Sequence, residues 1–146
     1  MSVELLPITK DNILNVLRLQ VAEVQQEFIM SNAMAIALCY VQKESIPLAV
    51  QYNDEIIGMV MYEKEVPNES YDIQILMIDE KYQGQGIGKA TFEKLLDLLK
   101  SKNDCEKIIL NYVPSNKGAE RFYRSFGFLP NGEMFNNEIV MELKIN

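Results

Sequence analysis

Hydrophobic and polar positions in the first forty residues indicate one strand followed by helices. The apolar segment 3–8 ends at the turn-forming residues 9–12, which favours a first strand leading into a capped helix. From 21 to 41 the chain has no Gly or Pro, and apolar residues recur at helical spacing with a break near Ser31-Asn32. We therefore expect a short helix and then two further helical pieces. The apolar positions of the first helix are Ile13, Leu14, Val16, Leu17 and Leu19.

The next segment is typical of a hairpin. Pro47 opens two expected strands, over 48–52 and 56–62, which are rich in β-branched and aromatic residues and are joined by Asn53-Asp54-Glu55. Residues 63–70, with Pro67-Asn68, are expected to form a loop.

A further strand is expected over 71–78. Four apolar residues alternate with polar ones, and the last residues are apolar on both sides, as in a strand that enters the centre of a sheet. The strand is expected to stop at Asp79-Glu80. The alternating apolar residues are Tyr71, Ile73, Ile75 and Met77, followed by Leu76 and Ile78 in the apolar end.

The last third of the chain predicts helix, strand, helix and two strands. Phe92, Leu95, Leu96 and Leu99 mark one helix face, residues 107–112 form the strand, and Ser115 or Asn116 can cap the second helix. That helix has Ala119, Phe122, Tyr123 and Phe126 on one face and ends at Gly127. The final strands, 128–129 and 139–145, surround a turn at Asn131-Gly132 or Asn136-Asn137.

This order of elements predicts a mixed α/β (α+β) sheet in a single domain over residues 1–146. The chain has the length of one ordinary domain, and its 48% apolar and 24% charged residues are close to the average of globular proteins.

Composition removes several classes of function. Fourteen Lys and Arg against 21 Asp and Glu give a net charge of −7, which opposes nucleic-acid binding because phosphates require cations. The absence of His excludes His-dependent nucleophiles and His-ligated zinc, and Cys39 and Cys105 lack metal-binding spacing. We expect no metal site. No basic leader or long apolar run is present, so we expect no membrane segment and a cytoplasmic location.

A Gly-rich segment joins the strand at 71–78 to the helix that follows. Unpaired amides and the helix dipole bind anions at such a junction, and glycines let a phosphate approach the backbone. The segment is not a Walker loop, because Gly84 and Gly88 enclose three residues and Lys89 precedes Ala90. It also lacks the dinucleotide-binding pattern, since Thr91 stands where the last Gly would fall. A flexible loop without a ligand would fit the glycine spacing equally well.

Two motifs together resemble the GNAT superfamily of N-acetyltransferases. The coenzyme A motif Gln-x-x-Gly-x-Gly is matched by Gln83, Gly86 and Gly88. The second motif, N-x-x-A-x-x-F-Y-x-x-x-G-F, is matched from Asn116 to Phe128, and the resemblance is clear over residues 48–143. It implies a GNAT fold, with about six to seven mostly antiparallel strands and about four helices, and acetyl-CoA as cosubstrate.

The resemblance implies roles for particular residues. Tyr123 would donate a proton or hydrogen bond to the departing thiolate, although its place on an apolar helix face also fits a packed aromatic. A base would be Asp72, Glu63 or Glu27, directly or through water. Loop amides would bind pyrophosphate, the strand end would bind the pantetheine arm and acetyl carbonyl, and Asn116 would contact the coenzyme or only cap its helix. The coenzyme residues implied are Met77, Ile78, Gln83, Gly84, Gln85, Gly86, Ile87, Gly88, Lys89 and Asn116.

Within the superfamily the chain looks like bacterial spermine/spermidine acetyltransferases, for example over 57–62 and 78–84. It departs from them at Met30 and at Gln74-Ile75, where those relatives carry an acid and an Asp-Arg pair. The resemblance implies a small polyamine (spermidine or spermine) or a diamine as acceptor, with another small amine or a peptide amine as the alternative. The residues expected to attract a distal ammonium are Glu27, Asp72 and Glu133.

Two other classes of function stay open. One is a module that binds acyl-CoA without turnover, and the other is a nucleotide-phosphate binder, which the failed Walker and dinucleotide patterns disfavour. The expected partner is a small-molecule amine, without nucleic acid or membrane, and a homodimer is an open alternative.

Overall fold

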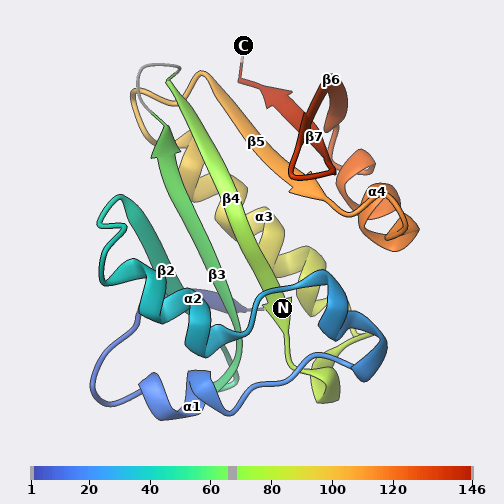
Figure 1. Cartoon of the computed structure of the whole chain (residues 1–146). Coiled ribbons are helices and arrows are strands. Elements are labelled where there is room, and N and C mark those ends of the chain that lie inside the picture. Colours follow the sequence, from blue (N-terminus) through green and yellow to red (C-terminus); the bar gives the residue numbers. More distant parts are fainter. Residues whose placement is uncertain (1, 66–68, 146) are drawn as a thin grey trace.

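A seven-stranded sheet with the order β1-β2-β3-β4-β5-β7-β6 forms the centre of the protein (Figure 1). The computed structural model describes residues 2–65 and 69–145, and the strand count refers to them. Neighbouring strands are antiparallel except β4 and β5, which are parallel, so the expected mixed, mostly antiparallel sheet is confirmed. The strands are β1 (Val3–Pro7), β2 (Ser45–Tyr52), β3 (Glu55–Glu65), β4 (Ser70–Ile78), β5 (Lys107–Tyr112), β6 (Leu129–Phe135) and β7 (Glu138–Lys144).

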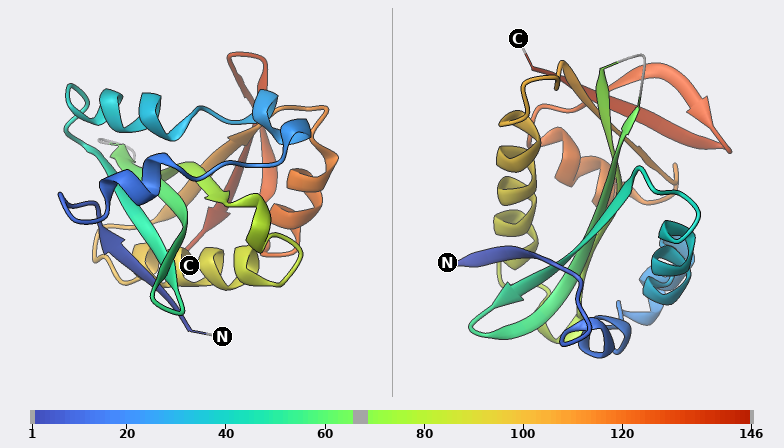
Figure 2. Two further views of the ribbon diagram at one scale, coloured as in Figure 1. Left: turned by 90° about the horizontal axis from the view of Figure 1, so that it is seen from below. Right: turned by 90° about the vertical axis from the view of Figure 1, so that its left-hand side faces the viewer.

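Helices cover both faces of the sheet (Figure 2). The long helix α3 and the short helix α4 lie on one face, whereas α1 and α2 lie on the other. Their bounds are α1 (Ile13–Leu17), α2 (Asn32–Cys39), α3 (Ile87–Lys100) and α4 (Lys117–Arg124), with the 3₁₀ helices η1 (Glu23–Phe28) and η2 (Glu80–Tyr82) between them.

The two faces bury separate apolar clusters. Beneath α3, its fully buried Phe92, Leu95 and Leu99 pack with apolar residues of the central strands. Beneath α1 and α2, Val16 and Ala35 pack against the other face of the sheet. Burial of such side chains contributes about 1.5–3 kcal/mol each, so these clusters hold the layers together.

The helical prediction for 21–41 is half right. Ser31 caps α2, accepting a hydrogen bond from Met34 N at 3.2 Å, and the break expected near Ser31-Asn32 is therefore confirmed. The first piece is wrong as an α-helix, because η1 is a 3₁₀ helix. None of its residues is buried, so no apolar face packs to favour an α-helix there.

Two strand boundaries also differ from the prediction. Pro47 lies inside β2 rather than at its start, which is tolerated because pairing with β1 begins only at Leu48. Residues 63–65, expected in a loop, extend β3 and pair with the start of β4. The part of that expected loop at Pro67-Asn68 lies outside the described residues. The final turn is at Asn136-Asn137, where both residues have positive φ.

β4 contains a bulge at Gln74. Tyr62 of β3 pairs with Ile73 and the preceding Met61 pairs with Ile75, so Gln74 has no opposite residue. A bulge shifts the side-chain alternation by one residue. Tyr71 and Ile73 accordingly belong to the cluster beneath α3, whereas the next two apolar residues, Ile75 and Met77, belong to the cluster beneath α1 and α2.

The pairing of β4 with β5 stops at the same place. The last paired residues are Ile73 and Leu110, so the two parallel strands separate beyond them. The interior of the sheet therefore contains an opening, with one edge of β4 unpaired from Gln74 to Ile78.

Candidate active site

A groove of about 1000 Å³ lies at the opening between β4 and β5. Its walls come from the ends of both strands, from η1, from α4 and from the loop before α3. The groove brings together these predicted residues: Glu27, Met77, Ile78, Gln83, Gly84, Gly88, Asn116 and Tyr123. The other predicted residues do not line it: Glu63, Asp72, Gln85, Gly86, Ile87, Lys89 and Glu133.

The loop before α3 presents its backbone amides. Gly84 and Gly86 have φ of 76° and 81°, a conformation that L side chains rarely adopt. The first intrahelical hydrogen bond runs from Ala90 N to Gly86 O at 3.1 Å, and the N-cap residue is Gly86, which has no side chain to cap the helix. Within the part of the chain that is described, the amides of 84–89 have no backbone partner. Together with the dipole of α3 they can bind an anion.

Side chains of this loop are engaged elsewhere. Gln83 Nε2 donates to Ile78 O at 2.8 Å and to Gln25 Oε1 of η1 at 2.9 Å. Gln85 Nε2 donates to Lys81 O at 3.1 Å, Ile87 is buried in the core, and Lys89 is exposed. The groups offered to an anion are therefore mainly backbone amides.

Tyr123 of α4 lines the groove with its ring packed between aromatic side chains. Its ring centroid lies 5.4 Å from that of Phe92 and 6.3 Å from that of Phe128. Burial raises the pKa of its phenol to about 12, so the hydroxyl is protonated at neutral pH. The two interpretations of Tyr123 are therefore compatible. Its ring packs among aromatic side chains, and its protonated hydroxyl can donate a hydrogen bond.

Asn116 caps α4. Its Oδ1 accepts a hydrogen bond from Ala119 N at 3.1 Å, and the residue also lines the groove. Capping alone accounts for an Asn at this position, and a contact with the coenzyme is compatible with it.

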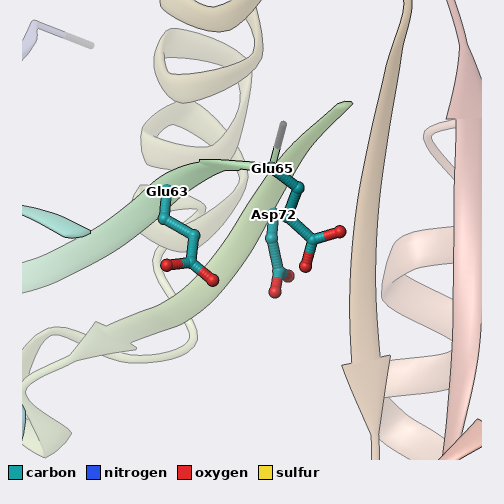
Figure 3. Close-up of side chains that lie close together, drawn as sticks. All are labelled: Glu63, Glu65 and Asp72. Carbon is teal, nitrogen blue, oxygen red and sulfur yellow. The ribbon is translucent and has the colours of Figure 1, made fainter. Parts of the chain in front are cut away.

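Three carboxylates gather where the end of β3 pairs with the start of β4 (Figure 3). Glu63 and Glu65 come from β3 and Asp72 from β4, and one oxygen of each lies within 4.8 Å of the others. Glu63 and Asp72 are directly paired across the strands, and Ser45 Oγ donates to Glu63 Oε2 at 3.3 Å. We call these three residues the acidic cluster. Asp72 lies two residues before Gln74, and Gln74 lines the groove.

The cluster is electrostatically unfavourable by itself. Burial and the charges of Glu65 and Glu63 raise the pKa of Asp72 to about 7. Burial also raises the pKa of Glu63. Glu27 stands apart in the groove wall, and Glu133 is exposed on β6 outside both sites.

The sequence interpretation did not identify two groove residues, Gln74 and Glu138, as possible ligands. Gln74 entered it as one polar position of an alternating strand and as a departure from the Asp-Arg pair of the resembled acetyltransferases, and Glu138 follows the last turn without any motif. Because a bulge and a strand pairing place them, no local signal in the sequence could identify them.

Comparisons with known proteins agree with this geometry. The model of the Acetyltransferase (GNAT) family matches residues 16–128. A Bacillus subtilis protein named spermine/spermidine N(1)-acetyltransferase is 32% identical over 151 aligned positions, which cover 97% of each chain.

Solved structures share the fold at lower identity. Aminoglycoside acetyltransferase AAC(6')-Ib in complex with coenzyme A superposes with a TM-score of 0.80 at 21% identity, covering 98% of this chain and 95% of that one. The paiA N-acetyltransferase of Thermoplasma acidophilum, also with coenzyme A, gives 0.74 at 15% identity, covering 99% and 100%.

The chain therefore belongs to the acetyltransferase (GNAT) family. It is an N-acetyltransferase with acetyl-CoA as its cosubstrate. Among the described residues, no helix is both long and apolar enough to span a membrane.

Proposed function

We propose that this protein acetylates a small polyamine, spermidine or spermine, with acetyl-CoA as donor. The observation that carries the proposal is the lining of one groove, which combines an anion-binding loop with two carboxylates, Glu27 and Glu138. The loop suits the phosphates of a coenzyme, and the carboxylates suit a cationic amine. The near full-length similarity to a protein named for spermine and spermidine supports this acceptor class.

The groove fits a phosphorylated coenzyme with an extended amide-containing arm. We assign the pyrophosphate to the amides of 84–89, since these have no backbone partner among the residues that the structure describes. The unpaired edge of β4 at Met77 and Ile78 suits the arm, because an exposed strand edge pairs readily with another amide. When bound, the coenzyme supplies the activated acetyl thioester.

Tyr123 is assigned to the leaving sulfur. A phenol with a pKa of about 12 transfers its proton unfavourably to a thiolate, whose conjugate thiol has an ordinary pKa of about 8.5. Its contribution is therefore a hydrogen bond to the developing charge, and the coenzyme thiolate takes its proton from solvent.

The acceptor must lose a proton before it attacks, because an alkylammonium has a pKa of about 10. Glu27 lines the groove, whereas the other two candidate bases, Asp72 and Glu63, lie outside it. We assign proton acceptance to Glu27, directly or through water. Glu27→Gln is expected to lower kcat/KM about a hundredfold. Glu23→Gln on the same η1 helix, outside the groove, is the control and should leave kcat/KM within twofold.

The proposal is tested by incubating the protein with acetyl-CoA and spermidine, spermine, a diamine or a monoamine. Free thiol and acetylated product are measured together, and acetylspermidine is the expected product. Coenzyme binding without thiol release in the presence of any amine would instead define a non-catalytic acyl-CoA-binding module. Acetylation of peptides alone would replace the polyamine as acceptor.

A further inference from the structure

Two buried polar side-chain atoms without a hydrogen-bond partner among the described residues lie on β4. Ser70 Oγ and Gln74 Oε1 are the buried side-chain polar atoms without a hydrogen-bond partner in the described ranges 2–65 and 69–145. They belong to the residues two before and two after Asp72 on β4. Ser70 and Asp72 lie two apart before the bulge and therefore point to the same face, roughly 6.5–7 Å apart, whereas Gln74 stands at the bulge itself, where this alternation is interrupted. Ser70 is only 1% exposed, so its hydroxyl receives little help from solvent.

Two residues of the acidic cluster, Glu63 and Glu65, lie beside this row on the neighbouring strand β3. Glu63 is paired with Asp72, and Glu65 is paired with Ser70, so the Ser70 side chain stands beside the carboxylates. A buried polar group left unpaired is destabilising, and mutual repulsion among three carboxylates adds to this.

Nearby cations are engaged elsewhere. Lys64 pairs with Asp104, and Lys107 Nζ lies 3.9 Å from Glu142 Oε2. In the described residues the row and the cluster therefore have several acceptors and no cationic side chain to satisfy them. This excess of acceptors over cationic donors indicates a ligand that has both a positive charge and N–H donors.

We propose that the row Ser70, Asp72 and Gln74, with Glu63 and Glu65, is the subsite for the part of the acceptor beyond its reacting amine. The cluster and Ser70 Oγ share the three N–H donors of one terminal ammonium group of the polyamine, and Gln74 Oε1 accepts an N–H bond from the next nitrogen. The inference rests on the proposed function, because it takes the acceptor to be a polyamine.

The dimensions agree with an ammonium ligand. Three oxygens that each accept a bond of about 2.8 Å from one tetrahedral ammonium lie about 4.6 Å apart, and the cluster oxygens lie within 4.8 Å of one another. Gln74 belongs both to the row and to the groove wall. A polyamine with its reacting nitrogen in the groove can therefore follow β4 from Gln74 to the cluster, with three or four methylenes between successive nitrogens.

Spermidine binding to the intact protein gives the first test. Calorimetry without acetyl-CoA compares the wild type with Glu63→Gln/Glu65→Gln, which is expected to bind spermidine at least tenfold more weakly. The matched control, Glu93→Gln/Asp97→Asn, removes two charges from exposed positions of α3 on the other face and should bind within twofold. Equal weakening in both double variants would mean that overall charge attracts the polyamine, and the subsite would be rejected.

Turnover gives the second test and separates this inference from the proposed function. The variant Glu63→Gln/Glu65→Gln should lose at least tenfold in kcat/KM for spermidine while its kcat/KM for a monoamine stays within twofold. Ser70→Ala should reduce the spermidine value several-fold in the same selective way. If wild type acetylates spermidine and both variants match it, the inference fails and the proposed function stands. If wild type neither binds nor acetylates spermidine, both fail.

A divalent cation is the competing ligand for three carboxylates. Calcium and magnesium are titrated into the wild type and into Glu63→Gln/Glu65→Gln. Unchanged heats in the two proteins are expected. Metal binding by wild type alone, with equal spermidine binding by both, would make the cluster a metal site and overturn the inference.

Discussion

The two halves of β4, on either side of the bulge at Gln74, offer two kinds of site. Beyond the bulge, the strand edge and the loop before α3 present backbone groups, and the side chains nearby are mostly buried or engaged with one another. Before the bulge, the strand presents unsatisfied side chains next to the acidic cluster. The first half depends on backbone conformation and the second on charge, so substitutions should affect coenzyme and acceptor separately.

The largest expected effect is on chemistry in the groove. Tyr123→Phe should lower kcat about a hundredfold and leave the coenzyme Kd within twofold, because the hydroxyl acts only as charge develops on sulfur. Pre-steady-state and steady-state thiol release, with calorimetry for the Kd, measure the two quantities. Tyr52→Phe, at a partly buried tyrosine outside the groove, is the control. Normal turnover in Tyr123→Phe would leave only a packing role for this side chain.

A smaller effect, on coenzyme binding alone, is expected from the half of β4 beyond the bulge together with the loop before α3, which we call the backbone half. Gly84→Val should weaken coenzyme binding tenfold or more, because a branched side chain obstructs the amides and disfavours φ of +76°. Gly132→Val has the same conformational strain at φ of +89°, and both positions open into empty space. The two variants should lose equal thermal stability without ligand, while only Gly132→Val keeps the coenzyme-induced shift in Tm. A normal shift in Gly84→Val would place the pyrophosphate elsewhere.

The pH dependence of the free energy of unfolding should distinguish the half of β4 before the bulge, which carries Asp72 of the acidic cluster and which we call the charged half. The folded pKa of Asp72, about 7, exceeds its ordinary value of 3.8, so the folded state binds more protons between these limits. Stability is then lost as pH rises from about 4 to 7. Asp72→Asn removes the loss and should raise the free energy of unfolding at pH 8 by on the order of 1 kcal/mol or more, and by less at pH 4.

A carboxylate with the opposite shift provides the control for that measurement. Lys64 and Tyr71 lower the pKa of Asp104, so Asp104→Asn should be destabilising at pH 8 rather than stabilising. Urea unfolding at pH 4 and pH 8 compares the two variants. Destabilisation by Asp72→Asn at pH 8 would show that the charged form of Asp72 is stabilised in the fold.

The smallest effect is expected from the contact between the loop before α3 and η1. Gln83 links the loop to η1 through Gln25, so Gln83→Met should loosen the η1 wall of the groove. We expect a several-fold increase in the KM of the amine with little change in kcat, measured at saturating acetyl-CoA. Gln85→Met, which removes a bond within the loop only, should leave that KM unchanged. Equal KM values in both variants would mean that η1 is held by other contacts.

Much of the backbone half could be predicted from the sequence because its signals are local. Glycines at 84, 86 and 88 lie a few residues after an apolar strand, and the pattern from Asn116 to Phe128 lies within one helix and its end. These short-range features predicted the fold class, and the groove does bring Gly84, Gly88, Asn116 and Tyr123 together.

The charged half could not be predicted in the same way, because it depends on pairing between strands. Glu63 and Glu65 were expected in a loop, yet β3 continues through them and places them opposite Asp72 and Ser70. Glu27 and Glu133 were grouped with Asp72 by charge alone, and the fold separates all three. The bulge at Gln74 also cannot be identified from an alternation of apolar residues that continues unchanged through it.

The opening between β4 and β5 has a consequence for amide hydrogen exchange. On most central strands both edges are paired, and their amides exchange only when the structure opens. From Gln74 to Ile78, the edge of β4 that faces the groove has no strand partner within residues 2–65 and 69–145. Its outward amides should exchange quickly in the free protein although they lie mid-sheet, and slowly once an extended ligand takes the place of the missing neighbour. Exchange rates at these few amides would thus report occupancy of the groove without any measurement of turnover.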